Sequence, residues 1–225
     1  MINFSHVYKT YGDKSADDSI HALKNIDLQI AKGEFVFLTG PSGAGKTSLF
    51  KLISAFDRPS SGNLNVAGLH LNELKNKDLP LFRRKIGVVF QDFKLLKERT
   101  VFENVALPLI IRGDRTQNIK KRVMEVLDQV NLADRAHQRP DLLSGGEQQR
   151  TAIARAIIHQ PGILIADEPT GNLDPRLTEE IIDLFERVSV QGTTVFIATH
   201  DHEMVKRRKK RTVEIIAGEI ANHGA

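Results

Sequence analysis

The sequence contains no cysteine. The chain therefore has no disulfide framework, no thiolate metal site and no cysteine nucleophile, which excludes disulfide-stapled scaffolds and thiol enzymes. This composition is compatible with a reducing compartment.

Long hydrophobic runs are also missing. The longest are residues 35–38, 105–111 (which Pro108 interrupts) and 163–166, and all fall well short of the ~18–20 apolar residues needed to cross a bilayer. The first residues, MINFSHVYKTYG, lack the basic and then apolar layout of a secretory signal. We expect a chain that does not span a membrane itself, so that any role at a membrane depends on a partner or a surface contact.

Basic residues are in only small excess over acidic ones. The 32 basic and 28 acidic residues give a net charge of +4, which is too small to indicate a nucleic-acid-binding protein. The 225 residues, 40% hydrophobic and 27% charged, suffice for one α/β domain with a full-sized core. No internal repeat or low-complexity linker is present.

Hydrophobic periodicity predicts an α/β fold. Alternating or continuous apolar runs predict strands at 2–8, 26–30, 35–39, 60–68, 85–91, 163–167 and 194–199, and two short strands within 213–224. Helical spacing begins near Gly45 and covers 101–111, 116–131, 146–159 and 176–190, while 12–19 is a polar loop. Strands and helices alternate at both ends of the chain, which predicts a parallel sheet with crossover helices around an all-helical insert at 92–160.

The segment GPSGAGKT (40–47) lies between an expected buried strand and the helix that follows it. Its glycines allow the backbone to curl so that successive N–H groups point at an anion, and the helix adds the positive end of its dipole. Lys46 can bridge two phosphates, and the Thr47 hydroxyl can bind Mg²⁺. The alternative is a glycine-rich turn with a solvated lysine, but the flanking elements favour a phosphate-binding loop.

The segment ILIADE (163–168) is an apolar strand that ends in two carboxylates. Beside a magnesium triphosphate, Asp167 would hold the metal and Glu168 would polarise the attacking water. An acidic loop after a core strand is the simpler alternative. The position of this segment downstream of GPSGAGKT favours the catalytic interpretation.

The segment LSGGEQQR (143–150) places a serine and two glycines at the start of an expected helix. Such a helix start is a second anion site, which one monomer with one triphosphate does not need. Two monomers arranged head to tail do need it, because each loop can then close on the nucleotide of the other. The alternative is an ordinary serine cap, with Ser144 at the N-terminus of the helix.

Together these motifs resemble those of the ATP-binding cassette (ABC) family, and the likeness covers residues 2–220. Besides the three segments above, Tyr11 resembles the aromatic that stacks on adenine, and Gln91 in VVFQD resembles the Q-loop glutamine. Asn172, Leu173 and Asp174 resemble the D-loop, and His200 in ATHD resembles the switch histidine. The resemblance implies a P-loop NTPase fold with a RecA-like parallel-sheet core, an antiparallel β subdomain and an α-helical subdomain. The single domain 1–225 would divide into 1–91 with 161–225 (core and β subdomain) and 92–160 (helical subdomain, ending in the signature motif).

The resemblance also implies a set of site residues for MgATP. Tyr11 would stack on the base, Ser42 to Ser48 would wrap the phosphates, and Ser144 to Gly146 would bind the γ-phosphate held by a second subunit. The implied catalytic residues are Lys46, Gln91, Glu168 and His200, and the implied metal-binding residues are Thr47, Gln91 and Asp167. The implied cofactor-binding residues are Tyr11, Gly40, Pro41, Ser42, Gly43, Ala44, Gly45, Lys46, Thr47, Ser48, Ser144, Gly145, Gly146 and Asp174.

Two stretches, 74–96 and 99–113, look most like the cell-division ATPases of the family. That resemblance implies an ATP-bound homodimer, peripheral at the cytoplasmic face of the membrane at the division site. It would drive a polytopic membrane partner that controls cell-wall hydrolysis. The alternatives are the ATPase of a true transporter (lipoprotein release, macrolide export or amino-acid import), a nucleic-acid-dependent ABC protein and a non-catalytic scaffold. The length of the chain disfavours the second, and the intact site residues disfavour the third, so no specific nucleic acid is expected.

The run KRRKKR (Lys206, Arg207, Arg208, Lys209, Lys210 and Arg211) is unusually basic. We interpret it as a solvated helix end. The alternative is a contact with anionic lipid, which gains about 1 kcal/mol for each Lys or Arg near the surface.

Overall fold

The computed structural model describes residues 1–12, 19–171 and 173–224. The strands are β1 (Ile2–Tyr11), β2 (Ile20–Ile30), β3 (Phe35–Thr39), β4 (Ser61–Val66), β5 (Leu69–His70), β6 (Ile86–Val89), β7 (Ile163–Asp167), β8 (Thr194–Ala198), β9 (Arg211–Ile216) and β10 (Glu219–Asn222). The helices are α1 (Lys46–Ile53), α2 (Leu79–Arg83), α3 (Val101–Arg112), α4 (Thr116–Gln129), α5 (Gly145–Ile157), α6 (Pro175–Val190) and α7 (His202–Arg208), with 3-10 turns at Asn76–Asp78, Ala133–Arg135 and Pro140–Leu142.

The central sheet has the strand order β10-β9-β3-β8-β7-β6. Its pairs are parallel except for β9 with β10, which confirms the predicted parallel sheet. The strand β3 is apolar up to its last residue, Thr39, and is buried throughout, as fits a strand covered on both faces. Phe35 and Phe37 belong to the core cluster shared with α3–α6, whereas Val36 and Leu38 belong to the cluster around α1 and the second sheet.

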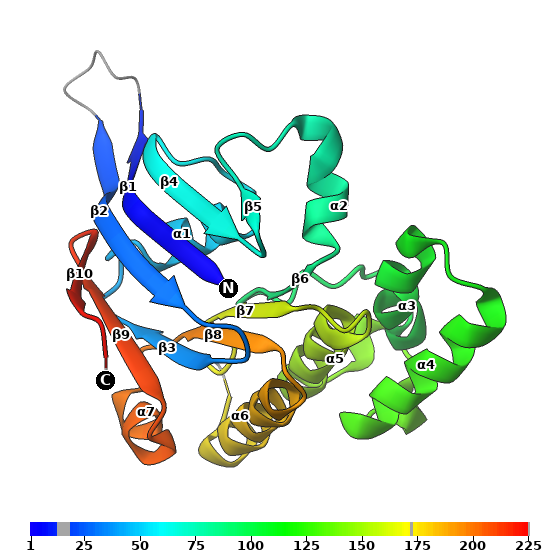
Figure 1. Cartoon of the computed structure of the whole chain (residues 1–225). Helices are drawn as coiled ribbons and strands as arrows, with labels where there is room; N and C mark the ends of the chain where they lie inside the picture. Colours follow the sequence, from blue (N-terminus) through cyan, green and yellow to red (C-terminus); the bar gives the residue numbers. More distant parts are fainter. Residues whose placement is uncertain (13–18, 172, 225) are drawn as a thin grey trace.

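The second sheet has the strand order β2-β1-β4-β5, and its pairs are antiparallel. It lies across the central sheet with α1 between the two (Figure 1). Alternate residues of β1, including Ile2 and Phe4, are fully or almost fully buried in that layer, as the alternating pattern predicts. The strands β1 and β2 are both longer than predicted, and β1 therefore carries Tyr11 at its end.

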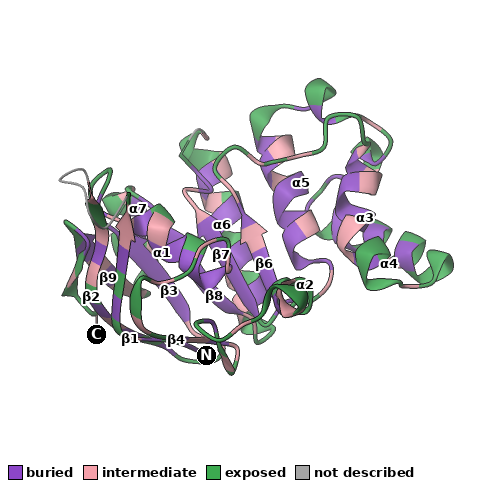
Figure 2. Cartoon of the chain, turned by 90° about the horizontal axis from the view of Figure 1, so that it is seen from above, coloured by how far each residue is buried: buried purple, intermediate pink, exposed green. Residues whose placement is uncertain are grey.

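Helices α3, α4 and α5 occupy the chain between β6 and β7. They stand to one side of both sheets (Figures 1 and 2). The helix α3 begins with a capping box, in which Thr100 and Glu103 bond each other's backbone N–H groups. The helical character of this region is as expected, and the division of the chain at residues 91 and 160 stays a prediction.

The elements that sequence periodicity did not predict are β5, α2 and α7. They are 2, 5 and 7 residues long, which is too short to show a hydrophobic period. The polar loop predicted at 12–19 lies largely outside the described residues, as does Asn172 of the predicted D-loop.

Candidate functional site

A pocket of about 550 Å³ lies where the second sheet meets the carboxyl edge of the central sheet. In open α/β sheets, ligands bind at this edge. The predicted site residues that line it are Tyr11, Ser42, Gly43, Gly45, Lys46, Thr47, Ser48, Gln91, Asp167 and Glu168. The structure therefore brings together side chains that are up to 157 residues apart (168 minus 11) in the sequence.

The loop between β3 and α1 forms one wall of the pocket. Gly40 has φ 147°, and a Cβ there would lie 2.1 Å from the Ile215 carbonyl oxygen. The loop can therefore pass beside β9 only with glycine at this position. Lys46 begins α1, and its ammonium donates hydrogen bonds to the carbonyl oxygens of Gly40 (2.7 Å) and Pro41 (3.0 Å). The lysine is thus held over the loop where phosphate oxygens would lie.

Thr47 and Asp167 meet at the pocket from α1 and the end of β7. The Thr47 hydroxyl donates a hydrogen bond of 2.8 Å to the Asp167 carboxylate. Burial raises the pKa of Asp167, and the nearby charge of Glu168 adds to this, while Thr47 and Lys46 oppose it. A partly buried carboxylate beside a hydroxyl is an arrangement that a hard divalent cation would stabilise.

These two oxygen donors fit Mg²⁺. The described residues hold no cluster of three or more His, Cys, Asp or Glu that would form an all-protein metal cage. Mg²⁺ does not need one, because it usually keeps several waters and takes only one or two protein oxygens together with phosphate oxygens. The donor set and the pocket beside it are therefore of the kind that magnesium nucleotides use.

Glu168 follows β7 in an unusual backbone conformation. Its φ is 47°, which is uncommon for a residue other than glycine and occurs mostly where a site imposes it. Its N–H donates to the Ala198 carbonyl (3.0 Å), and its carboxylate lies 3.2 Å from His200 Nδ1. Glu168 also lines a second cavity of about 280 Å³ that includes His200, so it faces both the nucleotide-sized pocket and the histidine.

The other predicted residues lie outside the lining of the first pocket. Gly40 and Pro41 instead face Lys46 through their carbonyls, and Ala44 is buried in the core. Asp174 caps α6 by accepting a hydrogen bond from the Leu177 N–H (3.0 Å). Of the described residues, Ser144, Gly145, Gly146 and His200 are likewise not among those that line this pocket.

Ser144 caps α5 in a reciprocal pair with Glu147. A Cβ on Gly146 would lie 2.1 Å from Leu177 Cδ2, whereas one on Gly145 would have nothing within 4 Å. A side chain at position 146 would therefore have to displace Leu177 of α6, whereas Gly145 leaves the helix start open. The first turn of α5 is a helix N-terminus of the kind that binds anions, separate from the pocket within one copy of the chain.

Five residues of the pocket were missed by the sequence analysis: Ile20, His21, Ala22, Ala217 and Gly218. They come from the start of β2 and from the turn between β9 and β10. Gly218 contacts the glycine-rich loop by donating its N–H to the Ala44 carbonyl (3.0 Å), a contact that depends on tertiary structure. No local sequence signal identifies these residues.

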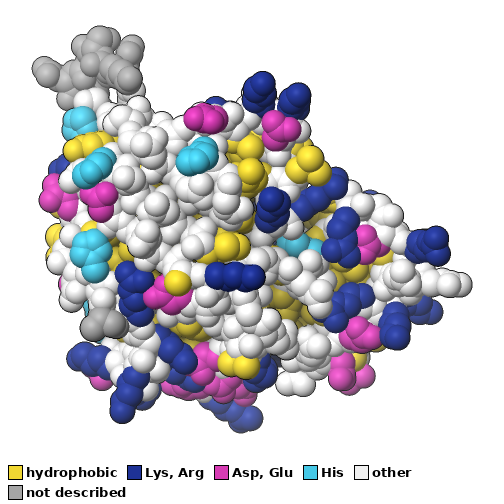
Figure 3. All heavy atoms as spheres, viewed as in Figure 1, with side chains coloured by type: hydrophobic (Ala, Val, Ile, Leu, Met, Phe, Trp, Pro, Cys, Tyr) yellow, Lys and Arg dark blue, Asp and Glu magenta, His cyan; other side chains and the backbone are white. Residues whose placement is uncertain are grey.

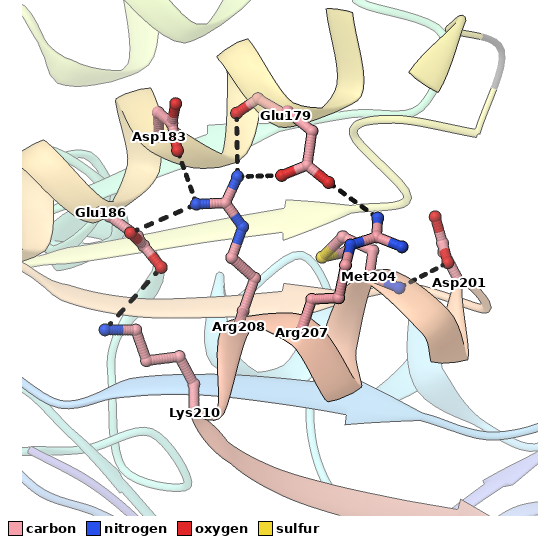
Figure 4. Close-up of polar contacts among 8 residues, drawn as sticks. All are labelled: Glu179, Asp183, Glu186, Asp201, Met204, Arg207, Arg208 and Lys210. Carbon is pink, nitrogen blue, oxygen red and sulfur yellow. Dashed lines mark hydrogen bonds and ion pairs between the residues drawn. The ribbon is translucent and has the colours of Figure 1, made fainter. Parts of the chain in front are cut away.

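The structure divides the basic run: Lys206, Arg207, Lys209 and Lys210 are exposed, and Arg208 is only partly so. The Arg208 side chain is only 16% exposed, and it pairs with Glu179, Asp183 and Glu186 of α6 (Figure 4). Arg207 also pairs with Glu179, and Lys210 with Glu186. A solvated helix end is therefore wrong for Arg208, because three acidic residues at helical spacing on α6 form a complementary stripe. Arg207, Arg208 and Lys210 therefore pair with α6, whereas Lys206 pairs with Glu203 of its own helix and Arg211 pairs with Glu34.

Residues 23–171 match the protein family described as ABC transporter. The FtsE cell-division ATP-binding protein of Mycobacterium tuberculosis is 48% identical over 220 residues, which is 98% of this chain and 94% of that protein. FtsE of Escherichia coli K12 is 47% identical over 225 residues, which is 100% of this chain and 98% of that protein.

Two solved structures of the ATP-binding cassette MJ0796 superpose with a TM-score of 0.90. One is a dimer in a post-hydrolysis state bound to ADP and Pi, and it is 39% identical to this chain. The match covers 99% of this chain and 97% of the MJ0796 chain. The other is a dimeric structure of the same cassette, 40% identical. Within the part of the chain that the structure describes, every helix is too short or too polar to cross a lipid bilayer.

Proposed function

The chain belongs to the ATP-binding cassette family of ATPases, and from this premise we propose that two copies close head to tail on two molecules of MgATP. The chain is a cell-division ATPase: it binds and hydrolyses ATP, and it works as a homodimer. The observation that carries the head-to-tail arrangement is the separation, within one copy, of the loop at 40–48 from the helix start at Ser144–Gly146. Both are anion sites, so a second copy can supply the missing half of each centre.

At the phosphate end, we assign binding of ATP to the loop amides from Ser42 to Ser48 and to Lys46. The Lys46 ammonium would exchange its two carbonyl partners for β- and γ-phosphate oxygens. Thr47, Asp167 and Gln91 would hold the magnesium ion, which when bound neutralises charge on the phosphates. Tyr11 would stack on the base.

At the reacting end, we assign the general base to Glu168. Its carboxylate lies at the border of both cavities and can orient a water for in-line attack on the γ-phosphate. His200, 3.2 Å away, would hold Glu168 and hydrogen-bond the γ-phosphate. Ser144 and the amides of Gly145 and Gly146 would close over that phosphate from the other copy, beside Asp174.

Asp167→Asn is expected to stabilise the nucleotide-free protein at neutral pH by about 1 kcal/mol while abolishing Mg²⁺-dependent turnover. Burial raises the pKa of Asp167, so the folded protein carries this ionised carboxylate at a cost that asparagine removes. The measurement is urea unfolding in EDTA. The gain should shrink as the pH falls through the raised pKa, because the wild-type carboxyl is then neutral too. If Asp167→Asn were less stable than the wild type at pH 7, the ionised Asp167 carboxylate would not be a cost to the folded protein, and the prediction would be wrong.

For the membrane partner, we propose a polytopic protein resembling FtsX, which would place the chain at the cytoplasmic face of the membrane at the division site. A groove of about 420 Å³ between α2 and α3 supports this. Leu107, Pro108 and Ile111 give it an apolar floor, and Arg83, Arg84, Arg112 and Arg155 line it; hydrophobic and basic side chains adjoin there in Figure 3. Such a lining fits a short amphipathic segment that carries acidic residues.

Ile111→Glu is expected to abolish co-purification of the FtsX-like protein from detergent-solubilised membranes, because it places a carboxylate in the apolar floor of the groove. ATP binding by the isolated subunit should be unchanged. The matched control is Met124→Glu, another half-exposed apolar residue on the neighbouring helix α4. Retention of the partner by Ile111→Glu would refute this docking site. Capture of a transport permease by the wild-type chain would instead identify the chain as the ATPase subunit of a transporter.

A further inference from the structure

Lys9 is a buried lysine next to the base end of the pocket. It precedes Tyr11 by two residues on β1, so both side chains project from the same face of the strand. Its side chain is 11% exposed. A lysine is almost never this buried unless it is paired, and Lys9 belongs to none of the motifs described above.

The Lys9 ammonium joins three groups. It donates hydrogen bonds to the Asp57 carboxylate (2.6 Å) and to the Arg58 carbonyl (3.0 Å). It also lies over the Tyr11 ring, 4.7 Å from the ring centroid, which is within the range of a cation–π contact. One face of the tyrosine is therefore covered from within the protein.

Asp57 lies just after α1, the helix that begins with Lys46. Partial burial would raise the pKa of Asp57, but hydrogen bonds from Lys9 and the Arg58 N–H outweigh it and hold the pKa below its usual range. The buried Tyr11 hydroxyl is near Asp57 and near Ser48 of α1, but it makes no hydrogen bond within the described residues. The ion pair thus connects the strand that carries the tyrosine to the helix that carries the phosphate loop.

We propose that Lys9 and Asp57 are positioning residues that hold Tyr11 at a set distance from the phosphate loop with a single face open to the base. The ammonium supports the ring from one side, and the carboxylate keeps the ammonium in place. This inference rests on the proposed stacking of Tyr11 on the base. Beyond the stacking itself, it proposes that the buried Lys9–Asp57 ion pair, which joins β1 to the segment after α1, supports the ring.

The test compares ATP and ADP with inorganic tripolyphosphate, which has no base, by calorimetric titration of the full-length protein in Mg²⁺. Lys9→Met should weaken ATP and ADP binding about fivefold and leave tripolyphosphate binding unchanged. Lys9→Arg keeps the charge and the pairing with Asp57, so it should bind ATP nearly as the wild type does. If Lys9→Met does not fold, Asp57→Asn, which frees the ammonium, should give the same selective loss.

The same titrations on a Tyr11→Ala background locate the effect. Adding Lys9→Met there should cost no further affinity for ATP. An equal loss for ATP and tripolyphosphate, a further loss on the Tyr11→Ala background, or wild-type affinity of Lys9→Met would each overturn the inference while Tyr11 stacking survives. If Tyr11→Ala alone binds ATP normally, the stacking itself fails, and the inference fails with it.

Discussion

Replacing Glu168 with glutamine is expected to lower ATP turnover by a factor of about 10²–10³, the size of effect that removal of a general base has in other enzymes. Glutamine keeps the shape of the side chain but cannot take a proton from water. The phosphate loop and Lys46 are untouched, so ATP binding should persist. With hydrolysis slowed, the ATP-bound dimer should accumulate, because its opening depends on loss of the γ-phosphate.

Two measurements check the Glu168→Gln result: steady-state phosphate release and size-exclusion chromatography in MgATP. The control is Glu219→Gln, an exposed carboxylate on β10 that should leave both unchanged. The backbone of Glu168 is in the left-handed region and stays so with glutamine, so folding should not differ. A variant that binds ATP but stays monomeric would count against the dimer sandwich.

The second large effect concerns sharing between subunits. Ser144→Arg and Lys46→Ala should each be inactive alone, because every centre of such a homodimer lacks one half. An equal mixture should recover about a quarter of wild-type turnover, since about half of the dimers are then mixed and each of these has one intact composite centre.

The Ser144 and Lys46 variants must be folded for their mixture to be informative. Ser144 also caps α5, and losing the cap costs about 1 kcal/mol, so circular dichroism melts should accompany the assay. Val190→Arg introduces the same side chain at a position that is 89% exposed at the end of α6, and it should retain full activity. Absence of any recovery in the mixture, with both variants folded, would refute a centre shared across the interface.

Local sequence predicted the strands at 35–39 and 163–167 to the residue. Both are apolar without interruption because both faces are covered, and polar or glycine residues end them. The same kind of signal did not predict the short helix α7, whose position depends on the ion pairs between Arg208 and α6. Those partners lie at least 22 residues away in the chain, where no local pattern links them.

For the site, the order of motifs predicted a set of residues, and ten of them line one pocket. The order of motifs could not predict Ile20, Ala22 or Gly218. These residues line the pocket only because β2 and the turn before β10 fold against the loop at 40–48. The grouping of Lys9 with Asp57, 48 residues apart, has the same origin.

The sequence by itself determined the glycine-rich loop at 40–47, the acidic end of β7 and the helix start at Ser144, because each is a local arrangement of backbone and side chains. Only the tertiary structure decided that Arg208 pairs with three acidic residues of α6, that the buried Lys9 lies over Tyr11, and that one chain keeps its two anion sites apart. The reason is that charge pairing and burial depend on neighbours in space, and those neighbours come from distant parts of the chain.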